Sequence, residues 1–421
     1  LLHGDVGAGK TLVALSSMLL AVEAGFQTAL MAPTQILAEQ HYLTFKRLCE
    51  PLGIHVALRT GSRHEDSAPL PLFDADRWQK GLLNNDPSRP TASAKKTSEP
   101  DILIGTHALL YDPSAFTRLG FAVIDEQHKF GVLQRARLRD MGQTPDMLVM
   151  TATPIPRTLT MSLYGDLDVS TLDELPKGRG KIISAVRPST KLPDAVRFMR
   201  EHLEAGRQAY IVYPLIDDSE KLEAKAAVSA FEKWKKFLDP MPCALLHGRI
   251  PAEEKEVIME NFRTGKTKAL IATTVIEVGI DVPNANMMLI ESADRFGLAQ
   301  LHQLRGRIGR GEHKSYCILL TETDDAEALL KLQILEKTSN GFDIAEADWE
   351  LRGPGDLLGT AQSGMPPLRI GNLFRDKELM QRARGAAFVV IEKDPNLEQP
   401  AHATFRTLLQ STREASLSQV S

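Results

Sequence analysis

The chain has 421 residues, enough for two or three domains of about 150 residues that each bury a core of their own. Hydrophobic residues make up 43%, and the longest apolar stretch, Leu12 to Val22, contains two serines, so we expect no segment that crosses a membrane. Fifty basic and fifty-four acidic side chains give a net charge of −4. This balance disfavours a basic coat protein and leaves nucleic-acid binding to local patches. Three distant cysteines without zinc-type spacing favour a reducing compartment, the cytoplasm.

The first residues predict the end of a strand. Leu1, Leu2 and His3 lead directly into a glycine-rich loop, and no initiator Met or targeting segment precedes them. We therefore interpret the sequence as part of a longer protein.

Strands and helices alternate over residues 1–176. Apolar residues recur at helical spacing from Leu12 to Leu20, which predicts a helix after the loop. Short apolar runs predict buried strands at 27–31, 56–58, 102–104, 122–124 and 148–150. This alternation is typical of a parallel sheet with helices on both faces. Residues 62–100 interrupt it, because they are rich in Pro, Ser, Asp and Asn, and we expect a loop or insertion there.

A second alternation follows a basic segment. Between Pro176 and Lys191 five basic residues occur without an acid, and we interpret this segment as a linker. Strands are predicted at 209–213, 244–246, 269–271, 288–290 and 316–320, so residues 177–323 should form a second α/β domain. Residues 324–421 are predicted to form a smaller, mostly helical element. Within it, the Gly and Pro residues of 352–355 are expected to end a helix.

The octapeptide GDVGAGKT follows the first strand and fits the phosphate-binding pattern G-x-x-x-x-G-K-[ST] in full. In such a loop the glycines let backbone N–H groups surround phosphates, Lys10 reaches the β- and γ-phosphates, and Thr11 offers its hydroxyl to Mg²⁺. The complete pattern between a strand and a helix disfavours the alternative, a glycine-rich turn without a ligand. The residues assigned to nucleotide binding are Gly4, Asp5, Val6, Gly7, Ala8, Gly9, Lys10 and Thr11.

Two carboxylates stand at the carboxyl end of the predicted strand 122–124, where ligands of open α/β sheets bind. We expect Asp125 to hold Mg²⁺ directly or through water, and Glu126 to polarise the water that attacks the γ-phosphorus. The alternative is a solvated strand end with ordinary acids, which a complete phosphate-binding loop in the same domain disfavours.

The second domain carries an arginine motif at residues 303–310. Arg307 and Arg310 are three residues apart, so on a helix they would share one face and reach a triphosphate held by the other domain. Arginines of this kind stabilise charge on a transferring phosphoryl group. A basic surface helix is the alternative. We also assign Gln303 and Asp281 to the nucleotide site between the domains.

The order of these motifs resembles the second helicase superfamily, and several segments are similar to the RecG family of bacterial DNA helicases. The matching segments are residues 4–11, 31–35, 105–108, 125–132 and 151–158. Gln127 favours RecG over the related transcription-repair coupling translocases, which usually carry Glu there. The resemblance implies two RecA-like parallel-sheet domains in tandem and a small carboxyl-terminal helical element. The family's amino-terminal wedge domain is not part of this sequence.

The resemblance also implies the activity. We expect an ATP- and Mg²⁺-dependent motor that moves along double-stranded DNA at branched structures such as stalled forks and Holliday junctions, in recombination and DNA repair. The family further implies a monomer, with a single-stranded DNA-binding protein as a candidate partner. Residues 352–364 resemble the family's translocation element, which implies that Arg352 and Gln362 act on DNA.

Two other functions stay open at this point. One is a coupling-factor translocase, and the other is a regulatory ATP-binding module without motor activity. The presence of Lys10, Glu126, Arg307 and Arg310 disfavours the second.

Overall fold

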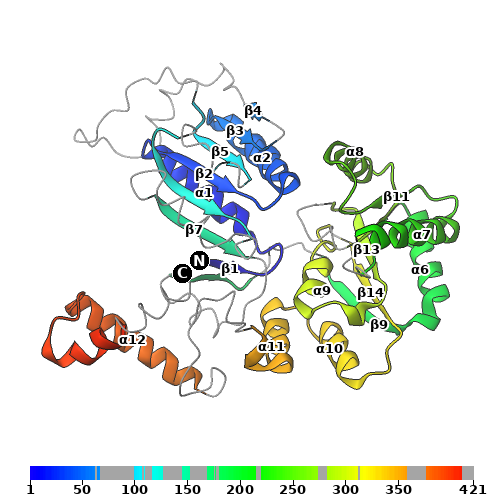
Figure 1. The fold of residues 1–421 in the computed structure, drawn as a ribbon. Helices are drawn as coiled ribbons and strands as arrows, with labels where there is room; N and C mark the ends of the chain where they lie inside the picture. The colour runs from blue at the N-terminus through cyan, green and yellow to red at the C-terminus, as the bar shows by residue number, and fades with distance from the viewer. Residues whose placement is uncertain are drawn as a thin grey trace. The chain divides into compact units, whose positions relative to one another are not determined.

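The structure is a computed structural model (Figure 1). It describes residues 1–61, 64–66, 99–106, 109, 116–126, 145–151, 168–174, 176, 180–214, 220–273, 282–311, 313–357 and 376–409. The chain divides into two compact units, one of Leu1–Pro154 with Ser170–Leu351 and one of Ile155–Val169 with Arg352–Ser421. Among the described residues no helix is both long and apolar enough to span a membrane.

The first sheet of the larger unit has the strand order β4-β3-β5-β2-β6-β7-β1-β8. Only its edge strand β4 is antiparallel to its neighbour; the other pairs are parallel. The strands are β1 (Leu2–Gly4), β2 (Gln27–Met31), β3 (Val56–Arg59), β4 (His64–Asp66), β5 (Ile102–Gly105), β6 (Leu119–Ile124), β7 (Asp146–Thr151) and β8 (Ser170–Leu172).

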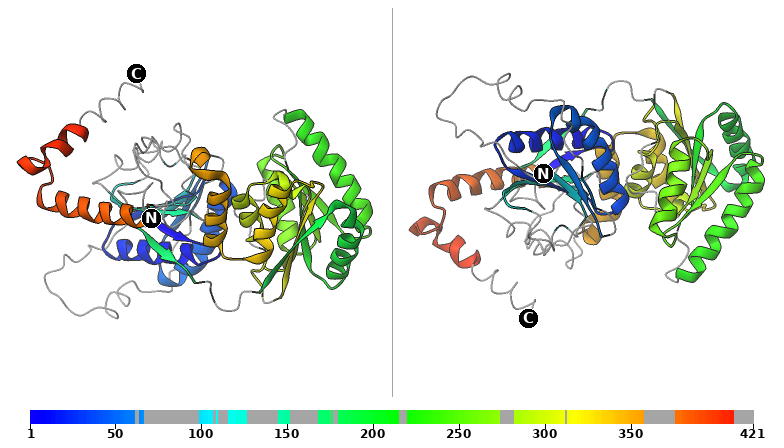
Figure 2. Two further views of the ribbon diagram at one scale, coloured as in Figure 1. Left: turned by 90° about the horizontal axis from the view of Figure 1, so that it is seen from below. Right: turned by 90° about the horizontal axis from the view of Figure 1, so that it is seen from above.

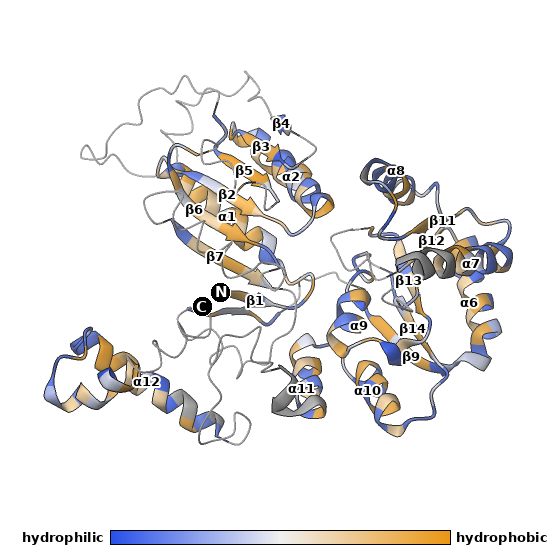
Figure 3. Cartoon of the chain, viewed as in Figure 1, coloured by the Kyte–Doolittle hydropathy of each residue, from blue (hydrophilic) through white to orange (hydrophobic). Residues whose placement is uncertain are grey.

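Strand β2 shows why this sheet has two buried faces. All five of its residues are buried, and successive side chains point to opposite faces. Leu30 packs with α1 (Lys10–Glu23) and α2 (Gln35–Cys49), whereas Met31 packs on the other face with Leu109 and Phe116. Figure 3 shows the resulting apolar character of β2 and β5. The predicted strands of this domain are therefore confirmed as central strands of a covered parallel sheet.

The second sheet has the order β11-β12-β10-β13-β14-β9, and all of its pairs are parallel. Its strands are β9 (Ile182–Pro188), β10 (Gln208–Val212), β11 (Cys243–Leu246), β12 (Ala269–Ala272), β13 (Ala285–Ile290) and β14 (Ser315–Thr321). The fold class, with two parallel-sheet domains, is thus confirmed.

Helices cover both faces of this second sheet (Figure 2). The helices α6 (Leu192–Glu204) and α7 (Glu220–Leu238) pack on one face. The helices α8 (Ala252–Arg263), α9 (Leu298–Arg305) and α10 (Ala326–Lys337) pack on the other. This arrangement places α9, whose last three residues begin the arginine motif, on the face shared with α10.

The interpretation of residues 176–191 as a linker is wrong for residues 182–188. Residues Ile182–Pro188 form β9, which pairs with the whole of β14 at the edge of the second sheet. Ile182 and Val186 pack against the core, while Arg187 and Pro188 are exposed. An edge strand tolerates a charged residue and a terminal proline, so composition alone could not separate it from a linker.

The prediction that residues 352–355 end a helix is also wrong. Helix α11 runs from Gly341 to Leu357 and continues through Pro354. A proline inside a helix costs about 3 kcal/mol, chiefly through one lost hydrogen bond and a steric clash, but it does not forbid the helix. Here only three residues follow it, so little of the helix depends on the strained turn.

The smaller unit contains α12 (Lys377–Lys393) and a turn in which the Asp394 carboxylate binds His402 Nδ1 at 2.7 Å. Most of its described residues are helical. The loop predicted at 62–100 stays a prediction, because most of residues 62–98 lie outside the described ranges. The predicted domain boundaries at 176 and 323 also stay predictions.

Candidate nucleotide site

The loop between β1 and α1 has the backbone shape that phosphate binding requires. Gly7 and Gly9 have φ angles of 77° and 94°, a left-handed region that side chains rarely adopt. Gly9 caps α1, and Lys10 is the first residue of that helix. The predicted strand–loop–helix context is therefore present, with the N–H groups of the first turn of α1 at the loop.

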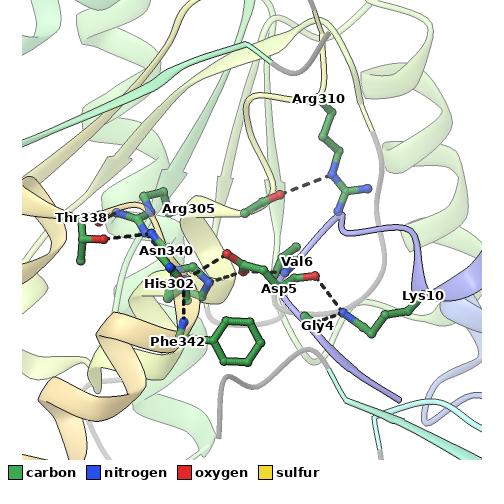
Figure 4. Close-up of polar contacts among 12 residues, drawn as sticks. Gly4, Asp5, Val6, Lys10, His302, Arg305, Arg310, Thr338, Asn340 and Phe342 are labelled. Atoms are coloured by element: carbon green, nitrogen blue, oxygen red, sulfur yellow. Dashed lines mark hydrogen bonds and ion pairs between the residues drawn. The ribbon is translucent and has the colours of Figure 1, made fainter. Parts of the chain in front are cut away.

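Lys10 folds back over the loop (Figure 4). Its Nζ donates hydrogen bonds to the carbonyl oxygens of Gly4 at 2.8 Å and Asp5 at 2.9 Å. Burial lowers the pKa of Lys10, whereas Asp125 and Glu126 raise it, and the net direction is downward. The ammonium of Lys10 therefore lies in the field of both predicted catalytic carboxylates.

Asp125 follows β6 and is buried. Its Oδ2 lies 2.9 Å from His41 Nε2, and its Oδ1 accepts the backbone N–H of Glu126 at 3.0 Å. Burial raises the pKa of Asp125, but the hydrogen bond and charge of His41, then Lys10, outweigh it and lower the pKa. Asp125 is thus held as a carboxylate. Glu126 has a φ of 53°, a strained backbone that directs the chain away from the strand direction.

Arg307 and Arg310 follow α9 rather than lying on it. The helix ends at Arg305 with Gly306 as its cap, and Gly309 has a φ of 76°, so the expected shared helix face is wrong. Burial and the neighbouring Arg310 lower the pKa of Arg307 to about 10, against the opposing effects of Glu126 and Asp125. The loop still brings this arginine into the field of the carboxylates.

The close approach of the two sheets' loops depends on a glycine. A Cβ on Gly306 would lie 2.6 Å from Cγ1 of Val6, a distance that real Cβ atoms do not show. Gln303 lies half-buried on α9, and Thr11 lies half-buried in the first turn of α1. Residues of the phosphate-binding loop and of the arginine motif therefore meet.

The remaining predicted residues are not placed. Asp281 and Gln362 lie outside the described residues, and Arg352 lies in α11 with only its backbone described.

Two histidines that contact residues of the site were missed by the sequence reasoning. His41 binds Asp125, and His302 Nε2 lies 2.6 Å from Oδ1 of Asp5. The partners are 84 and 297 residues apart, so no local pattern could have paired them.

Three family models match successive parts of the chain. Residues 1–162 match the DEAD/DEAH box helicase model, and residues 191–312 match the helicase conserved C-terminal domain. Residues 338–421 match the model described as ATP-dependent DNA helicase RecG, domain 3, C-terminal.

Curated relatives are similar along almost the whole chain. The ATP-dependent DNA helicase RecG of Synechocystis sp. is 46% identical over 404 residues, which cover 94% of this chain and 46% of that protein. RecG of Aquifex aeolicus is 45% identical, over 94% of this chain and 49% of that protein. The chain spans about half the length of these relatives.

Solved structures agree with this likeness. A structure of RecG bound to a three-way DNA junction matches with a TM-score of 0.65 and 41% identity, covering 90% of this chain and 47% of that one. Dbp5 of S. cerevisiae, at 16% identity and a TM-score of 0.55, shares the fold alone. The expected family is thereby confirmed: the chain belongs to the RecG-type helicases.

Proposed function

We propose that this chain is the motor of an ATP-dependent DNA helicase that moves along double-stranded DNA at branched structures. The observation that carries the proposal is the meeting of three distant motifs around Lys10. Gly306 of the arginine motif approaches Val6 of the phosphate-binding loop. The charges of Asp125, Glu126 and Arg310 act on Lys10, although the two carboxylates follow a strand of the first sheet and Arg310 belongs to the domain of the second. Arrangements of this kind perform phosphoryl transfer by positioning and charge stabilisation.

Each residue has a role that follows from its chemistry. Lys10 exchanges its two loop carbonyl partners for the β- and γ-phosphates of ATP. Glu126 accepts the proton of the attacking water, and Arg307 and Arg310 stabilise the negative charge of the transferring phosphoryl group. Gln303 and Asp281 complete the nucleotide site from the second domain.

Thr11 and Asp125 fit a Mg²⁺ site. Mg²⁺ prefers oxygen ligands and is usually held by one or two carboxylates together with substrate phosphates, so a dedicated protein cage is not needed. Within the described ranges, no cluster of three or more His, Cys, Asp or Glu side chains forms such a cage. The ionised Asp125 carboxylate supplies a charged oxygen ligand.

The DNA substrate is inferred from the relatives. The similar RecG structure was solved on a three-way DNA junction, which supports branched duplex DNA as the substrate here. Roles in recombination and repair, action as a monomer and contact with a single-stranded DNA-binding protein belong to the same proposal.

The proposal is tested with Lys10→Ala. Triplex-strand displacement measures movement along a duplex directly, and ATP turnover is measured with a three-way junction present. We expect wild-type protein to show both activities, and the variant to lose turnover by about 10³-fold, because no other cation replaces the lysine at the phosphates.

The matched control is Lys46→Ala. Lys46 lies on α2 in a partly exposed ion pair with Glu50 at 3.8 Å, which is worth about 0–1 kcal/mol, so the control should behave as wild type. Wild-type turnover in Lys10→Ala, or no DNA-stimulated turnover in the unaltered protein, would contradict the proposed function.

A further inference from the structure

The carboxylate of Asp5 faces away from the nucleotide lysine. It accepts three N–H groups: those of Val6 at 2.6 Å, His302 Nε2 at 2.6 Å and Gly341 at 3.0 Å. Burial raises the pKa of Asp5, but the hydrogen bond from His302 and those from the two backbone N–H groups outweigh it, and the pKa falls to about 2. Asp5 is therefore an anion that joins the phosphate-binding loop to α9 and to the first residue of α11 (Figure 4).

The hydrogen bond from Arg305 defines which ring nitrogen of His302 carries the proton. Arg305 Nη2 lies 2.9 Å from His302 Nδ1, and a guanidinium can only donate, so Nδ1 must be the acceptor. The proton of a neutral His302 then lies on Nε2 and is donated to Asp5. Arg305 in turn donates to the carbonyl oxygens of Leu335 at 2.9 Å and Thr338 at 2.8 Å, so the end of α10 is tied to the same network.

The start of α11 is packed too closely against this network to move independently. A Cβ on Gly341 would lie 2.8 Å from His302 Nε2 and 2.9 Å from Asp5 Oδ1. The ring of Phe342, the next residue, meets the ring of His3 edge-on at a centroid distance of 4.8 Å. Two residues at the start of α11 thus contact β1 and the loop that follows it.

The main chain of Asp5 belongs to the nucleotide site, because its carbonyl accepts from Lys10 Nζ at 2.9 Å. When Lys10 binds phosphate oxygens, it loses its hydrogen bond to the Asp5 carbonyl, because the three N–H donors of the ammonium are then used by the phosphates. One residue is therefore bound through its main chain to the phosphate-sensing lysine and through its side chain to α11.

We propose that Asp5 and His302 are positioning residues that carry the state of the nucleotide site to α11, so that ATP hydrolysis is coupled to movement on DNA. Helix α11 lies within residues 338–421, which match the carboxyl-terminal RecG model. The inference rests on the proposed function, because coupling has meaning only in a motor.

The test is His302→Leu, assayed for ATP turnover and for triplex-strand displacement on the same duplex. Leucine fills the buried site but donates no hydrogen bond to Asp5. We expect ATP KM and kcat within about twofold of wild type, and displacement per ATP hydrolysed about tenfold lower, the effect expected when a buried charged group loses one hydrogen bond. His302→Gln, whose amide can donate to Asp5, should recover most of the coupling.

The matched control is His202→Leu. His202 is half-buried on α6, and its Nδ1 lies 2.9 Å from the Phe198 carbonyl in the same helix, so this control should keep wild-type coupling. Gly341→Ala is the second test if His302→Leu unfolds at a lower temperature than the wild type. The added Cβ would displace His302 Nε2 and Asp5 Oδ1 without removing a polar group.

The outcomes separate the two proposals. If the unaltered protein hydrolyses no ATP on DNA, the proposed function fails. If it is an active motor but His302→Leu and Gly341→Ala lower turnover and displacement by the same factor, or change neither, the positioning role is overturned. Loss of coupling without loss of turnover supports it.

Discussion

Lys10 shows how the site balances buried charge. Moving an ammonium out of water lowers its pKa, and the nearby carboxylates Asp125 and Glu126 oppose this shift. The same carboxylates raise the pKa of the half-buried Arg307, whereas desolvation and Arg310 lower it, to about 10. Both cations therefore lie in the field of the anions that follow β6. Truncation of one carboxylate would change both the charge and the packing of the site, so a test of its chemical role needs a substitute that keeps the shape of the side chain.

Glu126→Gln is such a substitution. It keeps the shape of the side chain and loses the base, so we expect ATP binding close to wild type and turnover lower by about 10²–10⁴-fold. Binding is measured by titration with a fluorescent ATP analogue and turnover by phosphate release. Glu204→Gln, at an exposed position on α6, is the control. Equal losses of binding and turnover would argue against a general base.

At the scale of elements, α9 and the loop after it connect the second sheet to the nucleotide site. Leu298, Leu301 and Leu304 pack α9 into the core of the second sheet, which fixes where the helix ends. Gly306 then allows the backbone to approach Val6. A short loop that follows a well-packed helix therefore positions Arg307 and Arg310. This arrangement suits groups that act mainly in the transition state.

Arg310→Ala tests the proposed role of this loop in positioning an arginine at the transferring phosphoryl group. The Arg310 Nε donates to the Gly306 carbonyl at 3.4 Å, and the charge of Arg310 acts on Lys10, whose pKa it lowers. We expect turnover to fall by about 10³-fold and ATP affinity to fall much less. Arg263→Ala on α8, an exposed arginine paired with Glu260 at 2.8 Å, is the control and should change neither. A loss of affinity as steep as the loss of turnover would remove the assigned role from Arg310.

At the scale of the whole molecule, the nucleotide site and the proposed translocation element lie far apart in the sequence. Residues 4–11 and 352–364 belong to different units of the chain. In a motor, ATP hydrolysis at the nucleotide site must change the conformation of the element that moves the DNA. This coupling needs a structural element with two arrangements, whose equilibrium both sites influence. The contacts of Asp5 with α9 and α11 suit such an element.

Arg352→Ala and Gln362→Ala test the far end of this connection. We expect ATP turnover to persist while three-way junction unwinding falls by about tenfold or more, because the nucleotide site is intact and a grip on the DNA is lost. Arg382→Ala, at an exposed position on α12, is the control.

The alternative for Arg352 is an exposed ion pair with a nearby acid such as Glu350 or Asp356, worth about 0–1 kcal/mol. In that case its loss would change little. Turnover and unwinding that decline in parallel, or two unchanged activities, would rule out the coupling role.

The sequence by itself determined the parts of the molecule whose physics is local. The glycines and Lys10 of GDVGAGKT predict a phosphate-binding loop because a strand, a tight turn and a helix follow within one short segment. Buried strands such as Gln27–Met31 are read from a continuous apolar run, since both faces of a parallel sheet are covered. The same reasoning failed for β9, whose exposed edge position makes its composition resemble a linker.

Only the tertiary structure decided which side chains meet. The pairing of Asp5 with His302, and of Asp125 with His41, joins residues 297 and 84 positions apart. No sequence pattern indicates the partner of either histidine. A histidine on a buried helix face looks the same in the sequence whether it binds a backbone carbonyl or a carboxylate of the nucleotide site. The approach of Gly306 to Val6 likewise joins residues 300 positions apart. Such contacts arise when elements that are distant in the chain pack together, and sequence periodicity describes each element without specifying its neighbours.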